Sequence, residues 1–519
     1  MRLHDFLDHH ARDRPESEFA VHAGRKLSYA DAQAEANRIA NALIGAGLEA
    51  GDRVAFLAKN CIEYVLFYFG ASKAGVVPVP LNYRLAPPEW RTIVADAGAR
   101  LLVARGEFAA AIDPIRGDLA SVDRWVALDT PPPTGWESYA GWIDGADTGP
   151  PARRVDEDDD VYQMYTSGTT GRPKGAVLSH RGLCANLFQL LTVLSGEPGR
   201  RVLIVAPFYH AAAAVTAFSA ITWGGSLYIQ EEFDPAETVR ALDEEEIFSA
   251  TLVPAMIQAC LMMDSSVTER EYRGLRRILY GASPIAERTL RRAMDVFGCE
   301  FVQAYGMTET TAVLTFLLPE DHRKALAGHP HLLLSAGRAV VGTELRIVDE
   351  QDRPVENGTI GEICARAPQL MRGYWKLPDA TEATLRNGWM HTGDAGTLDD
   401  EGYLFVQDRT KDMIVSGGEN VYPREVEDVI FQHPAVADVA VIGVPNEQWG
   451  EAVKAIVVLR DGAAASADEI IDFCRGRLGG YKRPRSVDFA AELPRNPSGK
   501  VLKRELREPF WKDQRRRVS

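Results

Sequence analysis

Helical and extended sequence patterns alternate along the first part of the chain, and this alternation limits the fold more than any other feature. Residues 29–47 have the apolar spacing of an amphipathic helix, and residues 52–58 follow as a short apolar strand. A second pair repeats the order, with a helix predicted over 61–75 and a strand over 76–81. Such alternation is typical of βαβ units that build a mostly parallel sheet. The pattern resumes after Asp160, so we predict an α/β protein with layered subdomains.

The pattern changes in the last third of the chain. Residues 336–405 carry short strands between Gly, Asn and Asp turns, which predicts a small antiparallel barrel or sheet. A smaller α/β unit follows Lys411. We therefore expect a large N-terminal domain, residues 1–409, made of αβ-layered subdomains and a small β-barrel-like subdomain. A small C-terminal α+β domain is expected over residues 410–519.

Two segments need separate interpretation. Residues 131–160 are rich in Pro, Gly and Asp, which predicts a surface loop or linker. Residues 202–230 contain no formally charged side chain and are long enough to span a bilayer. Because Pro207, His210 and a Gly-Gly pair interrupt this run, we interpret it as strand, loop, buried helix and strand.

The composition argues against several classes of protein. The 519 residues, 46% hydrophobic and 25% charged, are typical of a globular chain with two or more domains. A net charge of −15 argues against nucleic acid as a main partner. Six cysteines are scattered without a CxxC pair, so we expect buried free thiols in a reducing cytoplasm rather than a zinc site or disulfides. The start of the chain has no apolar run before a cleavage site, so no signal peptide is predicted.

The loop at 165–177 surrounds one lysine, Lys174, with Ser, Thr and Gly. It is not a Walker A loop, because Lys174 follows Pro173 and the required Gly-Lys-Ser/Thr order is missing. Its hydroxyl donors, and glycines that let backbone N–H groups approach an anion, suit the β and γ phosphates of a nucleotide. A polar Gly-rich turn explains the loop equally well when it is taken alone. The candidate phosphate-binding residues are Thr166, Ser167, Gly168, Thr169, Thr170, Gly171 and Lys174.

Later motifs add further groups that a nucleotide needs. The stretch QAYGMTET offers the ring of Tyr305 for adenine, the hydroxyl of Thr308 for the α-phosphate and the carboxylate of Glu309 for Mg²⁺. The stretch HTGDAG offers Asp394, which could accept both ribose hydroxyls. Near the C-terminus, PRNPSGKVLKR contains Lys500. The joint presence of these motifs argues against a set of unrelated loops.

In this order and at these separations, the motifs resemble the adenylate-forming superfamily of acyl-CoA synthetases, aryl-CoA ligases, luciferases and peptide-synthetase adenylation domains. The likeness runs from the first helices to PSGKVLKREL and is greatest to bacterial fatty-acyl-CoA ligases. It implies that a carboxylate attacks the α-phosphate of ATP, which gives an acyl-adenylate and pyrophosphate. A thiol, usually that of coenzyme A, then attacks the acyl carbon and expels AMP. The cofactors implied are ATP, Mg²⁺ and coenzyme A.

The resemblance also implies roles for single residues. Lys500 would bridge the incoming carboxylate and the α-phosphate, and Lys411 would be the hinge of a mobile C-terminal lid domain. The implied catalytic residues are Lys500, Thr308, Glu309 and His210, with Glu309 also the metal ligand. Besides the phosphate loop, the implied ATP and AMP contacts are Gly281, Ala282, Ser283, Tyr305, Asp394 and Arg409. The implied CoA tunnel is lined by Gly417 and Gly418, and the acyl pocket by His210 and Ala214.

The acid itself is less well specified by the sequence. No basic residue near YGMTETTAVLTF could pair with a charged acid, so we expect an apolar monocarboxylic acid. A medium- or long-chain fatty acid is favoured, with an aryl acid of the cinnamate or benzoate kind as the alternative. Ala214 stands where some long-chain ligases carry a bulky aromatic gate.

Other functions and partners stay open at this point. The rival functions are a fatty-acyl-AMP ligase that loads a carrier protein, a light-emitting oxidative ligase and a non-catalytic binding module. The retained charged residues argue against the binding module, because such charges are costly to hold together without a ligand. We expect a cytoplasmic protein with small-molecule partners, no nucleic acid and no transmembrane segment. Peripheral membrane contact and a homodimer remain open.

Overall fold

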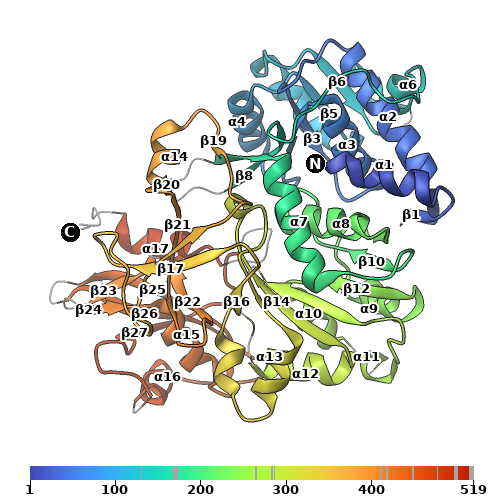
Figure 1. The fold of residues 1–519 in the computed structure, drawn as a ribbon. Helices are drawn as coiled ribbons and strands as arrows, with labels where there is room; N and C mark the ends of the chain where they lie inside the picture. The colour runs from blue at the N-terminus through green and yellow to red at the C-terminus, as the bar shows by residue number, and fades with distance from the viewer. Residues whose placement is uncertain are drawn as a thin grey trace.

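The structure, a computed structural model, describes residues 1–129, 131–166, 173–263, 266–281, 285, 287–409, 412–416, 419–446, 449–475, 477–495 and 501–512. Within them, two largely parallel sheets with helices on their faces make up most of the N-terminal part (Figure 1). Smaller antiparallel sheets adjoin them, and a separate α+β unit ends the chain. The predicted α/β fold class is confirmed.

The largest sheet has nine strands among the described residues. Its inner strands pair in parallel, whereas the strands at its two ends pair antiparallel. In spatial order the strands are β16 (Arg338–Ala339), β15 (Thr315–Leu317), β14 (Glu300–Tyr305), β13 (Arg277–Gly281), β12 (Ile247–Thr251), β10 (Arg201–Ile204), β11 (Ser226–Ile229), β1 (Glu18–His22) and β2 (Arg25–Ser28).

A second sheet is parallel throughout its described length. Its strands, in spatial order, are β4 (Val77–Pro80), β3 (Arg53–Leu57), β5 (Leu101–Ala104), β6 (Arg124–Ala127) and β7 (Glu137–Ser138). The helices around the two sheets are α1 (Leu3–Asp13), α2 (Tyr29–Gly45), α3 (Ile62–Ala74), α4 (Pro87–Ala97), α5 (Gly106–Ile112), α6 (Tyr139–Asp144), α7 (His180–Leu194), α8 (Ala211–Thr222), α9 (Pro235–Glu244), α10 (Pro254–Leu261), α11 (Ser266–Glu269), α12 (Glu287–Phe297) and α13 (Pro319–Leu326).

Three further sheets complete the fold. The antiparallel sheet that carries the Lys174 loop consists of β8 (Asp160–Thr166), β9 (Lys174–Ser179) and β19 (Gly373–Tyr374). Next along the chain are β17 (Glu344–Val348), β18 (Gly361–Arg366), α14 (Pro378–Thr384), β20 (Leu385–Arg386), β21 (Trp389–Leu398) and β22 (Leu404–Arg409). The described pairings of these strands form the predicted antiparallel sheet and do not close it into a barrel. The C-terminal unit contains β23 (Ile414–Ser416), β24 (Glu419–Val421), α15 (Pro423–Phe431), β25 (Val436–Asn446), β26 (Gly450–Leu459), α16 (Ala467–Phe473), β27 (Ser486–Phe489) and α17 (Lys503–Trp511).

The expectation of a loop over 131–160 is wrong for its central part. Trp136, Tyr139 and Ile143 are buried, and β7 and α6 form around them. The Ser138 hydroxyl caps α6 by accepting a hydrogen bond from the Gly141 N–H. The Pro and Gly content concealed a short amphipathic helix whose apolar side chains recur at helical spacing.

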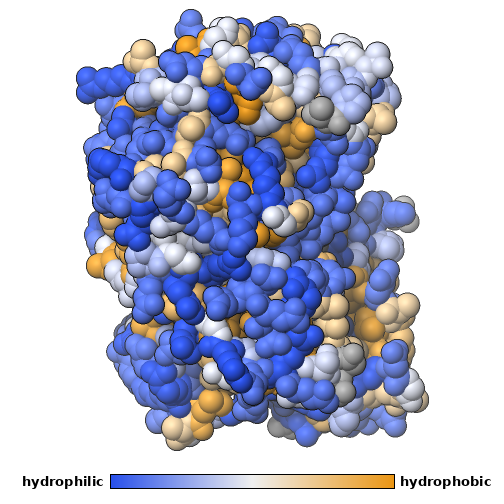
Figure 2. All heavy atoms as spheres, turned by 90° about the vertical axis from the view of Figure 1, so that its right-hand side faces the viewer, coloured by the Kyte–Doolittle hydropathy of each residue, from blue (hydrophilic) through white to orange (hydrophobic). Residues whose placement is uncertain are grey.

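The uncharged run 202–230 folds as β10, α8 and β11, as predicted. No helix among the described residues combines the length and the apolar character that crossing a membrane requires. The face shown in Figure 2 is mostly hydrophilic, with apolar atoms in scattered patches. Within the described chain, five of the six cysteines are buried and Cys299 is partly buried.

Helices α2 and α3 pack closely at the centre of the N-terminal core. A Ser28 cap with Asp31 begins α2, and Gly75, at φ +67°, ends α3. The two helices meet at Gly70, where an added Cβ would lie 2.5 Å from Ile39 Cγ2. A side chain at this position would therefore force the helices apart.

We expect Gly70→Ala to lower the free energy of unfolding by about 1–3 kcal/mol, because it overpacks this helix contact. Chemical denaturation measures the change. Gly45→Ala is the matched control, because a Cβ on Gly45 meets nothing within 4 Å. Equal denaturation midpoints for the two variants would contradict the assigned packing.

Candidate active site

Three motif residues lie at the ends of strands, where the loops of α/β folds commonly bind ligands. Thr166 ends β8, Gly281 ends β13 and Tyr305 ends β14. β13 and β14 are parallel neighbours, with Gly281 opposite Ala304. A Cβ on Gly281 would lie 2.3 Å from the Ala304 carbonyl oxygen, so this approach of the two strand ends requires glycine.

The turn after β14 is equally tight. A Cβ on Gly306 would lie 2.1 Å from the carbonyl oxygen of Ala312. A short 3₁₀ helix, η2 (Thr308–Thr310), follows, and Thr311 then adopts a φ of +65°. This geometry places Thr308 and Glu309 directly beyond the end of the strand.

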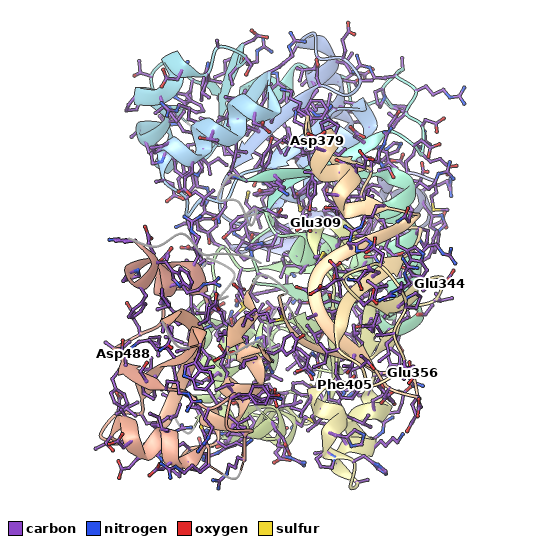
Figure 3. The ribbon with its side chains drawn as sticks, turned by 90° about the vertical axis from the view of Figure 1, so that its left-hand side faces the viewer. Glu309, Glu344, Glu356, Asp379, Phe405 and Asp488 are labelled. Atoms are coloured by element: carbon purple, nitrogen blue, oxygen red, sulfur yellow. The ribbon has the colours of Figure 1, made fainter. Side chains whose placement is uncertain are left out.

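Glu309 lies where two sheets meet, near the middle of the molecule in Figure 3. Its side chain is only 9% exposed. Its Oε1 accepts hydrogen bonds from the Thr166 hydroxyl at 3.3 Å and from the Tyr374 hydroxyl at 2.9 Å. A carboxylate surrounded by hydroxyl oxygens is a donor set that suits Mg²⁺.

Tyr374 also contacts Lys174, the lysine of the phosphate loop. Lys174 Nζ lies 4.9 Å from the centroid of the Tyr374 ring, within range of a cation–π interaction. The contact arises because β19 pairs with β9, which sets Tyr374 opposite Ala176. Sequence reasoning missed Tyr374, since only the pairing of two distant segments places it in the site.

Tyr305 and Asp394 form a second pair in the site. The Tyr305 hydroxyl donates to Asp394 Oδ2 at 2.8 Å, and Asp394 is 7% exposed. Asp394 lies on β21 directly opposite Arg409 on β22. The structure thus brings together Tyr305, Asp394 and the backbone of Arg409. Tyr305 precedes the other two residues by more than 80 positions in the sequence.

A cleft of about 1140 Å³ separates this part of the molecule from the C-terminal unit. One wall includes Tyr305, Met307 and Asp394, and the other includes Arg424 and Val501. Val501 is the neighbour of Lys500 in the sequence. Eleven of the predicted site residues lie outside the described part of the chain: Ser167, Gly168, Thr169, Thr170, Gly171, Ala282, Ser283, Lys411, Gly417, Gly418 and Lys500.

His210 begins α8 as its N-terminal cap residue. Burial and, to a smaller extent, the charge of Arg84 lower the pKa of His210 to about 4, so the ring is neutral at pH 7. Its Nε2 is buried and has no hydrogen-bond partner among the described residues. Ala214, one turn further along α8, is fully buried in the hydrophobic core. The face of the helix that is not packed carries the exposed Ala212 instead.

Known families match both parts of this chain. The family described as AMP-binding enzyme matches residues 7–375, and the family described as AMP-binding enzyme C-terminal domain matches residues 425–500. The chain belongs to the AMP-binding enzyme family. This confirms the resemblance of its motifs to the adenylate-forming superfamily.

Relatives of this AMP-binding enzyme differ in the acid that they are named for. It is 39% identical to the fatty acid–[acyl-carrier-protein] ligase ScoC of Streptomyces coeruleorubidus, over 98% of this chain and 96% of that protein. It is also 39% identical to a feruloyl-CoA synthase of an Amycolatopsis species, over 96% and 97% of the two chains. A solved Mycobacterium tuberculosis fatty acyl CoA synthetase superposes with a TM-score of 0.79 at 35% identity, over 99% of each chain. The predicted class, an AMP-forming acyl-CoA synthetase, is confirmed at the level of the family.

We expect Tyr374→Phe to lower kcat/KM for ATP by about tenfold or more, since a hydrogen bond to a charged group contributes about 1.5–3 kcal/mol. The variant removes the hydroxyl that orients Glu309 and keeps the ring beside Lys174. Pyrophosphate release measures the effect. Tyr228→Phe, which loses a hydroxyl bonded to Arg240, is the control and should match the unmodified enzyme. Equal rates for both variants would contradict a role for Tyr374 in orienting Glu309.

Proposed function

We propose that this AMP-binding enzyme ligates an apolar monocarboxylic acid to coenzyme A in two steps. In the first, a carboxylate oxygen of the acid attacks the α-phosphorus of ATP, and pyrophosphate leaves with the electrons of the broken P–O bond. In the second, the CoA thiol loses its proton, its sulfur attacks the acyl carbon and AMP leaves. The observation that carries the proposal is the Tyr305–Asp394 pair on one wall of a cleft, with Val501, the neighbour of Lys500, on the other.

The nucleotide would lie across the strand ends described above. Tyr305 offers a ring for adenine, and Asp394 with Arg409 offers groups for the ribose. Thr308 is assigned to the α-phosphate, and the 166–174 loop with Lys174 to the β and γ phosphates. Preorganised donors of this kind act where charge develops in the transition state.

We assign Glu309 as the protein ligand of Mg²⁺. The oxygen atoms around its carboxylate fit a hard cation. When bound, Mg²⁺ offsets the negative charge of the phosphates. Glu309 is held in place for this role by Tyr374.

The C-terminal unit is proposed as a mobile lid. Strand β22 ends at Arg409 and β23 begins at Ile414, so a short connection that includes Lys411 joins the two units. Rotation about Lys411 would withdraw Lys500 after adenylation and bring Gly417 and Gly418 to the CoA path. This is hinge gating, and it divides the chain into domains 1–409 and 410–519.

We expect Lys500→Ala to slow pyrophosphate release by about a hundredfold or more, because it removes the charge that stabilises the adenylation transition state. Thioester formation from supplied acyl-adenylate should change little. Lys503→Ala is the matched control, since Lys503 lines the same cleft and forms an ion pair with Glu427. Equal losses in both half-reactions would refute the role of Lys500.

Two threonines narrow the space along the unpacked face of α8. Thr216 Oγ1 lies 3.1 Å from Thr251 Oγ1 of β12, a hydrogen-bond distance. A cavity of about 20 Å³ lies beyond them, lined by Thr216, Ser219, Trp223 and Leu279 among others. His210 precedes Thr216 by six residues, or about 9 Å along a helix axis. We propose that this pair limits the acyl group to a medium-chain fatty acid or an aryl acid of similar length.

We expect Thr216→Ala to raise the kcat/KM ratio of decanoate to octanoate by about tenfold, because the shorter side chain and the small cavity beyond it leave room for a slightly longer acyl chain. Thr216→Val keeps the volume and should leave the ratio unchanged. Thr222→Ala, at the far end of the same helix, removes the same two groups, a methyl and a hydroxyl that donates to the Ser219 carbonyl, and serves as the control. An unchanged ratio in Thr216→Ala would place the acyl path elsewhere.

The test of the function itself is AMP formation across a panel of fatty and aryl acids, with and without CoA. Dependence on CoA and on one class of acid supports the proposal and identifies the acid. The similarity to ScoC makes carrier-protein loading the second candidate. Turnover with a phosphopantetheinyl carrier protein but not with CoA would support that second function.

A further inference from the structure

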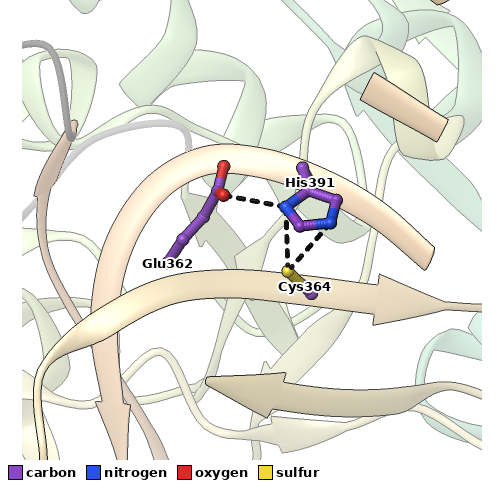
Figure 4. A group of neighbouring side chains, drawn as sticks. All are labelled: Glu362, Cys364 and His391. Atoms are coloured by element: carbon purple, nitrogen blue, oxygen red, sulfur yellow. Dashed lines mark hydrogen bonds and ion pairs between the residues drawn. The ribbon is translucent and has the colours of Figure 1, made fainter. Parts of the chain in front are cut away.

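Three side chains of β18 and β21 converge beside the ribose residues: Glu362, Cys364 and His391 (Figure 4). Glu362 Oε2 lies 2.8 Å from His391 Nδ1, and Cys364 Sγ lies 3.3 Å from the same nitrogen. Cys364 and His391 are buried, and Glu362 is half-buried. No role implied by the motifs uses any of the three.

Glu362 holds two residues of the neighbouring strand at once. Its Oε2 accepts the hydrogen of His391 Nδ1, and its Oε1 accepts the backbone N–H of Gly393 at 3.0 Å. The two carboxylate oxygens of Glu362 therefore hold His391 and Gly393, the two ends of the three-residue segment 391–393 that leads to Asp394.

That segment is a bulge in β21. In the pairing of β18 with β21, Glu362 is opposite Ala395 and Cys364 is opposite His391. One residue of β18, Ile363, thus faces three residues of β21, from Thr392 to Asp394. Gly393 adopts a φ of +71° there, a left-handed conformation that favours glycine. Bulges near active sites commonly redirect a side chain.

The remaining polar groups of the bulge are also satisfied. The Thr392 hydroxyl donates to the Ile363 carbonyl at 2.7 Å and accepts from the Asp394 N–H at 3.1 Å. The result is a fixed backbone at Asp394, whose carboxylate meets Tyr305. We propose that Glu362 is a positioning residue that holds this bulge so that Asp394 can select the ribose of the nucleotide; this rests on the proposed function.

The same three side chains are of types that bind Zn²⁺, and their ligand atoms lie within 4.8 Å of one another. The charges around them favour hydrogen bonding instead. Arg386 Nη2 lies 3.8 Å from Glu362 Oε2, and burial helps to raise the pKa of the Cys364 thiol to about 12. A nearby cation and a protonated thiol both oppose metal binding.

The test compares ATP with 2′-deoxy-ATP in pyrophosphate release and in equilibrium binding. Glu362→Ala should lower the preference for ATP about tenfold, mainly through KM, because the bulge loses both hydrogen bonds that Glu362 accepts. Glu362→Gln should retain the preference, since its amide can still bond to Gly393 and to the other tautomer of His391. If Glu362 contributed only its negative charge to the stability of the fold, Glu362→Gln would not retain the preference for ATP.

Glu344→Gln is the control, because Glu344, labelled in Figure 3, lies on the adjoining strand β17 and pairs with Arg366, four residues beyond Glu362 on β18. If Glu362→Ala does not fold, Thr392→Val removes the other anchor of the bulge and should lower the same preference. Retained preference in the folded variants, or equal loss with both nucleotides, overturns the inference.

Two further outcomes separate the inference from the function on which it rests. An unmodified enzyme that neither binds ATP nor forms AMP refutes the proposed function, and the inference falls with it. An active enzyme whose preference is unchanged in Glu362→Ala refutes the inference alone. Stoichiometric zinc in the purified protein, lost in Cys364→Ala, would assign the three side chains to a metal and overturn the positioning role.

Discussion

The hydrogen bond between Tyr305 and Asp394 joins two sheets that are otherwise built from separate stretches of chain. Tyr305 ends a strand of the large parallel sheet, and Asp394 lies on the antiparallel sheet of β17 to β22. The contact of Thr166 with Glu309 likewise connects the sheet of the phosphate loop to the turn after β14. The site therefore depends on how three sheets are set against one another, since no single sheet contains it.

Much of the fold followed from periodicity alone. Alternating helical and extended patterns predicted the parallel sheets, and regularly spaced turns predicted the antiparallel sheet. The segment that contains α6 was missed because Pro and Gly dominate its composition, whereas Trp136, Tyr139 and Ile143 supply its buried face. Composition averages over a segment, but burial depends on a few side chains at the right spacing.

The site was predictable where one motif carries several groups, as in Tyr305, Thr308 and Glu309. It was not predictable where a residue enters through pairing between distant strands. Tyr374 reaches Lys174 and Glu309 only because β19 adds to β9, and Glu362 reaches Gly393 only through the bulge in β21. Neither residue belongs to a run whose local pattern indicates a ligand. The place of such residues in the site can be predicted only when the strand register is known.

The pairing of β19 with β9 also affects the order in which the protein can mature on the ribosome. The lysine of the phosphate loop is made some two hundred residues before the tyrosine that packs against it. Domains fold as units during synthesis, beginning from the N-terminal side. A nascent chain that stops before residue 373 has the strands of both parallel sheets but lacks β19, the strand that pairs with β9. The contacts of Tyr374 with Lys174 and Glu309 can therefore form only after the chain has been made as far as residue 374.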